Sequence, residues 1–109
     1  MVFEQGDVVE VNFDPTLGHE PKKKRPALVV SSNDFNNSTS MTLVCPITST
    51  DNGFFLHESI PLKHSVYGFI EMEQLRAIDL DARKAIQIDH LNEKEMIPIL
   101  TCLKSFFDF

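Results

Sequence analysis

Short apolar runs, each closed by turn-forming residues, are the feature of this sequence that most restricts its fold. Val8–Phe13 alternates, with Val9, Val11 and Phe13 on one face, as expected for a strand with one buried side. Asp14-Pro15 ends that run, because proline has no N–H to donate to a sheet. Pro26–Ser31 is apolar on both faces, which indicates a central strand. Further strands are predicted at Met41–Ile47, Phe54–Ile60, Gly68–Gln74 and Arg83–Asp89.

Local signals add detail between these strands. Asn52-Gly53 is typical of a hairpin, here between the third and fourth strands. Leu75–Leu80 is expected to form a short helical turn, and Ile86 and Ile88 are expected to face inward. Ser32 is suited to cap a one-turn helix that runs through Phe35.

The last apolar stretch has helical spacing instead. Asn92 and Glu95 have the separation of a capping box. Pro98 predicts either a kink or a later start of this helix. One helical face, expected to pack on the core, carries Met96, Ile99, Leu100, Leu103 and Phe107. Short strands followed by one helix predict a mainly β domain with a C-terminal helix, a small curved barrel or sandwich spanning residues 1–109.

Composition limits the classes of function. The net charge is −6, which argues against non-specific coating of long nucleic acids but allows a local basic patch. No apolar run approaches the roughly 20 residues of a membrane span. The first residues lack the pattern of a signal peptide, so we expect a cytoplasmic protein. Cys45 and Cys102 have no partner at metal-binding spacing and are expected to be reduced, packed thiols.

Four of the ten Lys and Arg residues fall next to one another in one loop. Residues 22–25 read Lys-Lys-Lys-Arg, Glu20 precedes them, and the apolar strand at Pro26 follows at once. Loops of about twelve residues are usually functional or disordered. A guanidinium where such a loop meets a rigid strand suits recognition of phosphate, whereas a solvated basic turn is the alternative.

Strand ends supply the remaining polar groups. Arg25 opens the second strand and Thr48 closes the third, while Gln74 and Arg76 follow the fifth. If the second and third strands are antiparallel neighbours, Arg25 and Thr48 meet at one rim beneath the loop that holds Glu20.

Several segments, in register along nearly the whole chain, resemble the MazF/PemK family of toxin endoribonucleases. They are Gly6–Pro15, Gly18-x-Glu20, Arg25–Ser31, Cys45-Pro-Ile-Thr48, Gly68, Gln74-Leu-Arg76, Asp79 and Ala82-Arg83-Lys84. The resemblance implies a small SH3-like barrel that forms homodimers. It also implies cleavage of single-stranded RNA without a metal or other cofactor, and silencing by a cognate antitoxin whose tail fills the RNA groove. This chain has Glu73-Gln74 where the family often has Asp-Gln, and His19 and Lys22–Lys24 are not fixed family features.

The same resemblance implies that Arg25, Thr48 and Glu20 are catalytic. In metal-free cleavage the RNA 2′-hydroxyl attacks its neighbouring phosphate, so Arg25 would stabilise the phosphorane, Thr48 would donate a hydrogen bond, and Glu20 is the best candidate base. Phe54 and Phe55 are possible stacking surfaces. Residues expected to contribute to RNA binding are Phe13, Gly18, Lys24, Ser31, Gln74 and Arg76.

Three alternatives stay open at this point. Proteins resembling CcdB share the expected fold yet poison DNA gyrase by contact alone, and an SH3-like adaptor would need no chemistry. His57 and His64 are candidates for an acid and a base, although they lie in different segments.

Overall fold

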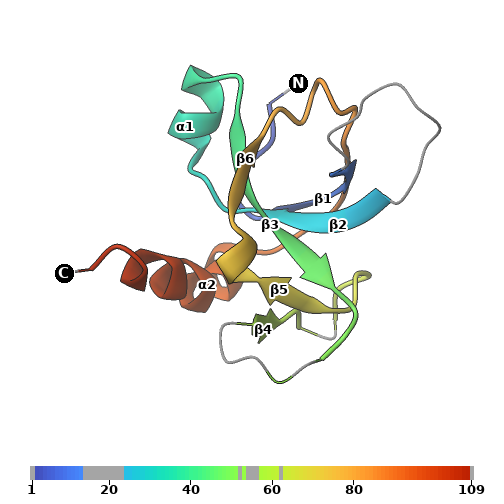
Figure 1. The fold of residues 1–109 in the computed structure, drawn as a ribbon, viewed down its shortest axis with the longest axis vertical. Coiled ribbons are helices and arrows are strands. Elements are labelled where there is room, and N and C mark those ends of the chain that lie inside the picture. Colours follow the sequence, from blue (N-terminus) through green and yellow to red (C-terminus); the bar gives the residue numbers. More distant parts are fainter. Residues whose placement is uncertain (1, 14–23, 52, 54–56, 62, 109) are drawn as a thin grey trace.

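Antiparallel strands make up most of the molecule (Figure 1). The structure is a computed structural model that describes residues 2–13, 24–51, 53, 57–61 and 63–108, with His57 described by its backbone alone. The elements in chain order are β1 (Asp7–Asn12), β2 (Lys24–Val29), α1 (Asn33–Ser38), β3 (Thr42–Thr48), β4 (His57–Ser59), β5 (Phe69–Glu71), the 3-10 helix η1 (Met72–Gln74), β6 (Arg76–Ile78), β7 (Ile86–His90) and α2 (Glu93–Ser105). None of the described helices is both long and apolar enough to cross a membrane.

Strand β3 connects the two parts of the sheet. The strand order is β4-β5-β3-β2-β1-β7, and β6 pairs with β3 as well. One edge of β3 therefore holds β2, and β5 and β6 pair with successive parts of the strand. The predicted β-rich fold with a C-terminal helix is confirmed, whereas no pairing among the described strands joins β4 to β7 to close a barrel.

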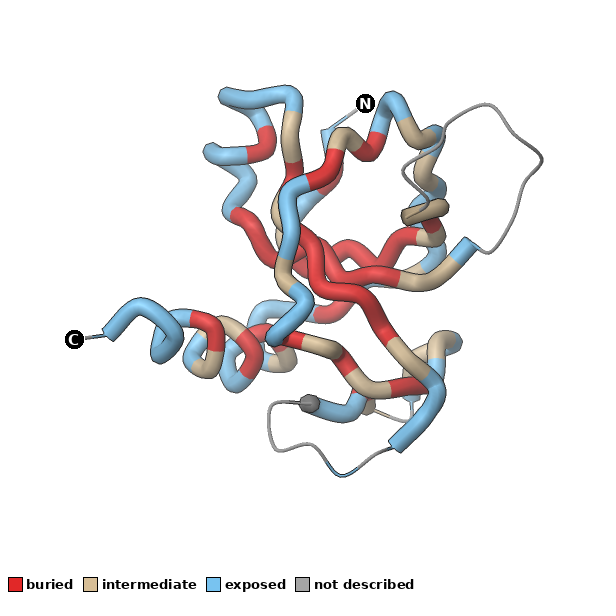
Figure 2. The backbone as a smooth tube through the Cα atoms, in the orientation of Figure 1, coloured by how far each residue is buried: buried red, intermediate tan, exposed pale blue. Residues whose placement is uncertain are grey.

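Both faces of the central strands are buried, as the apolar pattern of β2 predicts (Figure 2). Leu28 packs on the side covered by α2, together with Ile99 and Leu103. Ala27 and Val29 point to the other side, where a second cluster forms with Leu80. The alternation of β1 divides in the same way, because Val8 joins the first cluster and Val9 and Val11 the second.

Both predicted helix caps are present. The N–H of Phe35 donates to Ser32 Oγ at 3.1 Å, although α1 continues beyond Phe35 to Ser38. In α2, the Glu95 N–H donates to Asn92 Oδ1 at 2.8 Å and the Asn92 N–H donates to Glu95 Oε1 at 2.9 Å.

The helical face of α2 is confirmed only in part. Met96, Ile99 and Leu103 are buried, but Phe107 is 69% exposed because the helix ends at Ser105. Pro98 lies inside the helix, which begins at Glu93, so the later start is not observed.

Three strand predictions are wrong. The helical turn is η1, residues 72–74, and residues 76–78 form β6, so the predicted order of strand and turn is reversed after Glu71. Ile86 and Ile88 are 55% and 39% exposed and belong to neither core cluster of the described residues, so their face of β7 is not the inward one. Strand β4 pairs with β5 and not with β3, so the hairpin expected at Asn52-Gly53 is absent from the described strands. Asn52 itself lies outside the described residues.

The capping box gives the first testable prediction. Replacing Asn92 by Ala removes the acceptor for the Glu95 N–H and should lower the free energy of unfolding by about 1 kcal/mol. Asn92→Asp keeps an acceptor and serves as the matched control. Urea unfolding followed by circular dichroism measures both variants, and equal stability of Asn92→Ala and the wild type would contradict this role.

Candidate active site at the start of β2

Arg25, the second residue of β2, is attached to two other strands by its side chain. Its Nη2 donates to Glu71 Oε1 of β5 at 2.9 Å and lies 3.4 Å from the carbonyl oxygen of Ile47 in β3. The Arg25 side chain is 42% exposed, so these contacts hold the guanidinium while part of the side chain stays open to solvent. A charged group held in this way is already oriented for an anionic ligand.

Thr48 lies at the neighbouring strand end. The antiparallel register pairs Ala27 with Pro46, and therefore brings the start of β2 beside the end of β3. This arrangement of strand ends is the one predicted for Arg25 and Thr48. Thr48 Oγ1 accepts a hydrogen bond from the Thr50 N–H at 3.2 Å. A hydroxyl that accepts in this way still has its own O–H to donate.

Phe13 supports two guanidinium groups. The Cζ atom of Arg76 lies 5.1 Å from the centroid of the Phe13 ring, and that of Arg25 lies 6.0 Å from it. Both distances are within the range of cation–π attraction. The Arg76 side chain is further oriented by Gln74, whose Oε1 accepts from Nη2 at 2.9 Å. Phe13, Gln74 and Arg76, three of the residues predicted to bind RNA, therefore lie together with Arg25.

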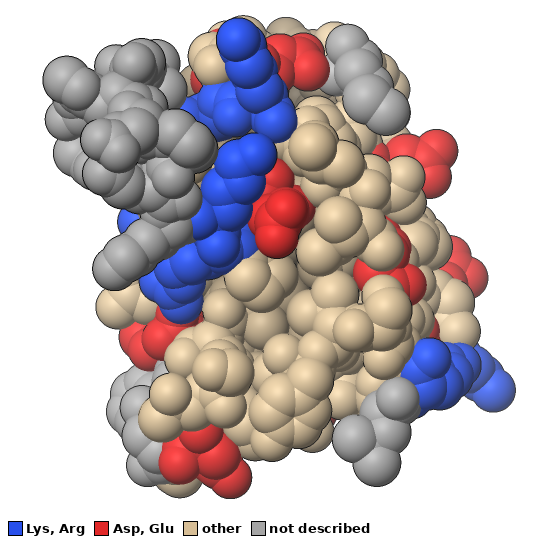
Figure 3. Space-filling model, turned by 90° about the vertical axis from the view of Figure 1, so that its right-hand side faces the viewer, with Lys and Arg blue, Asp and Glu red and all other residues tan. Residues whose placement is uncertain are grey.

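The face that carries these strand ends has a stripe of Lys and Arg side chains (Figure 3). Lys24 is exposed at the first position of β2, directly before Arg25. The site lies on an open surface where the ends of these strands meet. A groove of about 560 Å³ does exist elsewhere, but its lining includes Asn33, Met96 and Leu100 and none of the residues on this surface.

Ser31 does not belong to this surface. It follows the other end of β2 and is buried. Its hydroxyl bonds to Asn36 Oδ1 and accepts from the Leu43 N–H at 3.0 Å. The structure therefore corrects the expectation that Ser31 contacts RNA: its hydroxyl joins β2 to α1 and β3. Gly18, His19, Glu20, Phe54, Phe55 and the side chain of His57 lie outside what the structure describes.

Glu71 was not among the predicted site residues. It lies on the same face of β5 as Phe69, which pairs with Thr48. Glu71 alternates with the buried Ile70 along β5, but only the β3–β5 register shows that its face meets Arg25. Sequence alone offered no signal for that register.

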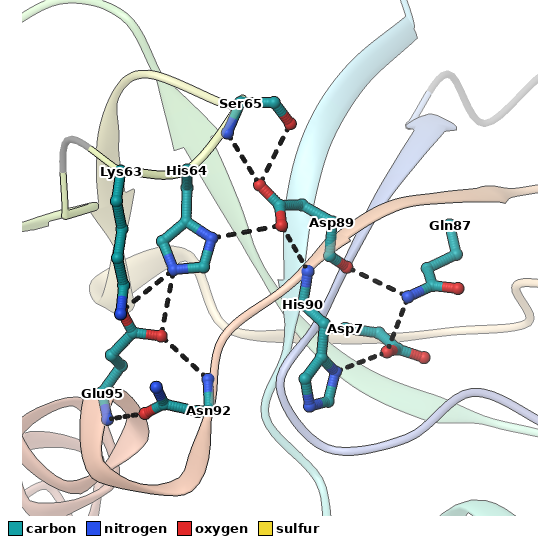
Figure 4. A network of polar contacts seen from close by, with 9 residues as sticks. All are labelled: Asp7, Lys63, His64, Ser65, Gln87, Asp89, His90, Asn92 and Glu95. Atoms are coloured by element: carbon teal, nitrogen blue, oxygen red, sulfur yellow. Dashed lines mark hydrogen bonds and ion pairs between the residues drawn. The ribbon is translucent and has the colours of Figure 1, made fainter.

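A second polar cluster surrounds His64 (Figure 4). Its Nδ1 lies 3.1 Å from Asp89 Oδ1 of β7, and its Nε2 lies 3.0 Å from Glu95 Oε1 of α2. Lys63 Nζ adds an ion pair to Glu95 at 3.2 Å. Ser65 donates to Asp89 Oδ2 through both its N–H and its hydroxyl. Ser, His and Asp are all present, yet the Ser65 hydroxyl is bonded to the carboxylate and not to the imidazole. This cluster joins three segments and is not arranged as a nucleophile with its base.

The carboxylates around His64 favour its charged form. Burial opposes the charge, but hydrogen bonds to Asp89 and Glu95 outweigh burial and raise the pKa of His64. Burial also opposes the charge on Asp89 and so raises its pKa, but hydrogen bonds from the His90 N–H, His64 and Ser65 outweigh burial and lower that pKa to about 2. The Asn92 N–H contributes most to lowering the pKa of Glu95 to about 2, and His64 and Lys63 add to the effect.

Cys45 and Cys102 are both free, as predicted. Burial, followed by the nearby Glu73, raises the pKa of Cys45 to about 12, which makes this thiol a poor nucleophile.

Glu4, Asp7 and His90 bring three possible metal-ligand atoms within 4.8 Å of one another. Asp7 already accepts from the Glu4 N–H and Gln87 and contacts His90 at 2.8 Å, so an ion is not needed to satisfy it.

Comparison with known proteins decides the family. Residues 4–107 match the family described as "PemK-like, MazF-like toxin of type II toxin-antitoxin system". The chain belongs to this family. It is 45% identical over 91 residues to the endoribonuclease toxin ChpB of Escherichia coli K12, covering 79% of this chain and 78% of ChpB. It is 32% identical to the endoribonuclease PemK of Escherichia coli, covering 90% of this chain and 77% of PemK.

Solved structures of the family have the same fold. MazF from Deinococcus radiodurans superposes with a TM-score of 0.83 at 30% identity, covering 97% of this chain and 96% of that one. A MazE–MazF structure from the same organism gives a TM-score of 0.84, also at 30% identity and with the same coverage. The resemblance seen in the sequence motifs is thereby confirmed for this PemK/MazF-family toxin.

The His64 cluster predicts how the stability of this toxin depends on pH. A histidine whose folded pKa is raised stabilises the fold fully below its unfolded value of about 6.5, and this contribution is lost as pH rises through the folded pKa. The difference in unfolding free energy between the wild type and His64→Gln should therefore be larger near about pH 6 than near about pH 9.

Urea unfolding of the wild type and His64→Gln over a pH series measures that difference. Asp89 and Glu95 have lowered pKa values, so their ionised forms stabilise the fold at neutral pH. This contribution is lost as pH falls towards about 2. A difference for His64→Gln that does not change between the two pH values would contradict the charged form of His64.

Proposed function

We propose that this toxin is a sequence-selective endoribonuclease that cleaves single-stranded RNA, with Arg25 and Thr48 at the scissile phosphate. The observation that carries the proposal is the β2–β3 register, which brings the strand ends that hold these two residues together. The endoribonuclease names of ChpB and PemK support RNA cleavage over gyrase poisoning by contact. An adaptor role would not need a guanidinium fixed at the rim by Ile47 and Glu71.

The proposed reaction uses the RNA as its own nucleophile. The 2′-oxygen bonds to the adjacent phosphorus as the 2′-hydroxyl proton passes to a base, a role we assign to Glu20 from the family resemblance. The bond from phosphorus to the 5′-oxygen then breaks, and that oxygen takes up a proton. The products carry a 2′,3′-cyclic phosphate and a 5′-hydroxyl.

Arg25 and Thr48 act on the charge that develops in this step. The phosphorane bears more negative charge than the ground-state phosphate, so donors fixed beforehand stabilise it preferentially. The Arg25 guanidinium supplies a permanent positive charge and paired donors. The Thr48 O–H supplies one neutral donor at the adjacent strand end. Neither group needs a metal ion for these roles.

The RNA would extend from this point over the arginine pair on Phe13. Arg76, oriented by Gln74, and exposed Lys24 would contact phosphates or unstacked bases of a single strand. Gly18 is assigned to RNA binding from the family resemblance. Because the whole chain carries a charge of −6, attraction to RNA depends on this local patch.

We also propose a cytoplasmic homodimer of one SH3-like barrel domain per chain, silenced by a cognate antitoxin. The Deinococcus radiodurans MazE–MazF structures support a protein partner of that kind. A dimer would place two Arg25 sites along one groove, where an antitoxin tail could cover both.

Substitution of the two site residues gives the central test. Arg25→Ala should lower the rate of cleavage of a long single-stranded RNA by at least about 10²–10³-fold, because it removes a donor to the phosphorane. Thr48→Val, which keeps the shape and loses the hydroxyl, should lower the rate as well. Lys104→Ala, which removes a positive charge on α2, is the control for net charge. Full activity of a folded Arg25→Ala variant would remove the central assignment.

The products and the metal requirement are predicted separately. Fragments should carry 2′,3′-cyclic phosphate and 5′-hydroxyl ends, because the 2′-hydroxyl is the nucleophile. Cleavage should continue in excess chelator, because Arg25 supplies the charge that a metal would otherwise provide. End-group analysis of fragments made with and without chelator measures both. Fragments with 5′-phosphate ends, or loss of cleavage in chelator, would indicate a different mechanism.

A further inference from the structure

Glu71 makes the shortest described contact to the proposed catalytic arginine. Its Oε1 lies 2.9 Å from Arg25 Nη2, and its side chain is only 20% exposed. The contact crosses from β5 to β2, which do not pair with each other, and β3 lies between them. The ion pair therefore joins β2 to β5 across the end of β3.

Glu71 is itself held firmly in place. Its neighbour Ile70 is fully buried and pairs with Ile47 of β3 and Glu58 of β4. Gly68 allows β5 to begin directly against the end of β3. It has a φ of 151°, and a Cβ atom there would lie 2.6 Å from the Thr48 carbonyl oxygen. A side chain at that position would push β5 away from Thr48.

The contacts that Arg25 makes with the described residues use one side of its guanidinium. Glu71 and the Ile47 carbonyl both face Nη2. The Nε and Nη1 atoms carry the other three N–H donors of the group. An arginine restrained in this way keeps donors for phosphate. It has also lost, before RNA binds, the rotamer freedom that a free side chain would lose on binding.

From these contacts we propose that Glu71 is a positioning residue for RNA cleavage, which holds the Arg25 guanidinium at the rim before RNA binds. This inference rests on the proposed function. A carboxylate beside the site also repels the phosphate of bound RNA, and this repulsion offsets the gain in ground-state binding that a restrained arginine provides. Its benefit arises in the transition state, where a correctly placed guanidinium meets the additional charge. Removal of Glu71 should therefore lower kcat while KM stays the same or falls.

The experiment compares three variants with the wild type. Glu71→Leu removes the acceptor at similar size, and Glu71→Gln keeps one oxygen acceptor without the charge. Glu58→Gln is the matched control, because its side chain lies on the opposite face from Glu71 and its substitution removes the same charge. We expect kcat on single-stranded RNA to fall about ten- to a hundredfold in Glu71→Leu and less in Glu71→Gln. The Glu58→Gln variant should retain the wild-type kcat.

A second measurement reports on Arg25 without RNA. In ¹⁵N-labelled protein, the guanidinium signals of Arg25 are identified by their loss in Arg25→Lys. They should show slow rotation of the guanidinium in the wild type and averaged signals in Glu71→Leu. Urea unfolding establishes that each variant is folded.

The outcomes separate the two proposals. A higher kcat, or an unchanged kcat with a lower KM, in Glu71→Leu would mean that Glu71 competes with RNA, which overturns positioning. Unchanged Arg25 signals in that variant would overturn it as well. If the wild type cleaves no RNA, the proposed function fails, whereas the guanidinium signals still decide whether Glu71 holds Arg25.

Discussion

The pairing of β3 with partners along both its edges is the constraint on which the site depends. The β2 register brings Arg25 to the end of β3, and the β5 register brings Glu71 to the same end. The packed clusters on the two faces of the sheet fix these registers, because a shift by one residue would exchange the side chains of the two clusters in β2 and turn Glu71 inward in place of Ile70 in β5. The geometry of a few polar atoms is thus set by the apolar core beneath them.

An acidic chain can still present a basic surface, because several of its carboxylates are hydrogen-bonded or ion-paired in other parts of the fold. Asp89 and Glu95 take donors from His64, Ser65 and Lys63, while Asp7 takes them from Gln87 and a backbone N–H. The guanidiniums that share the Phe13 ring are instead oriented toward one exposed surface. Recognition of RNA therefore depends on how the charges are distributed, and the net charge of −6 is a poor guide to it.

Local signals in the sequence predicted the parts of the fold that local physics decides. The caps at Ser32 and Asn92 and the two-sided burial of β2 are of this kind. Errors arose where tertiary contacts decide. Ile86 and Ile88 alternate as buried residues do, but neither core cluster reaches their face of β7. Ser31 has the hydroxyl of an RNA-binding residue, yet α1 covers it. Glu71 could be recognised only once the β3–β5 register was known.

The His64 cluster and the Arg25 site are close in sequence but are held by separate contacts. His64 lies four residues before Gly68, where the chain enters β5, so a loosened cluster could in principle disturb Glu71. Strand β5, however, is anchored by its pairs with β3 and β4 and by the buried side chains of Ile70 and Met72. These contacts do not change with pH. The charge on His64 should therefore influence how firmly residues 63–65 are attached to β7 and α2, while the placement of Glu71 against Arg25 is set by the sheet.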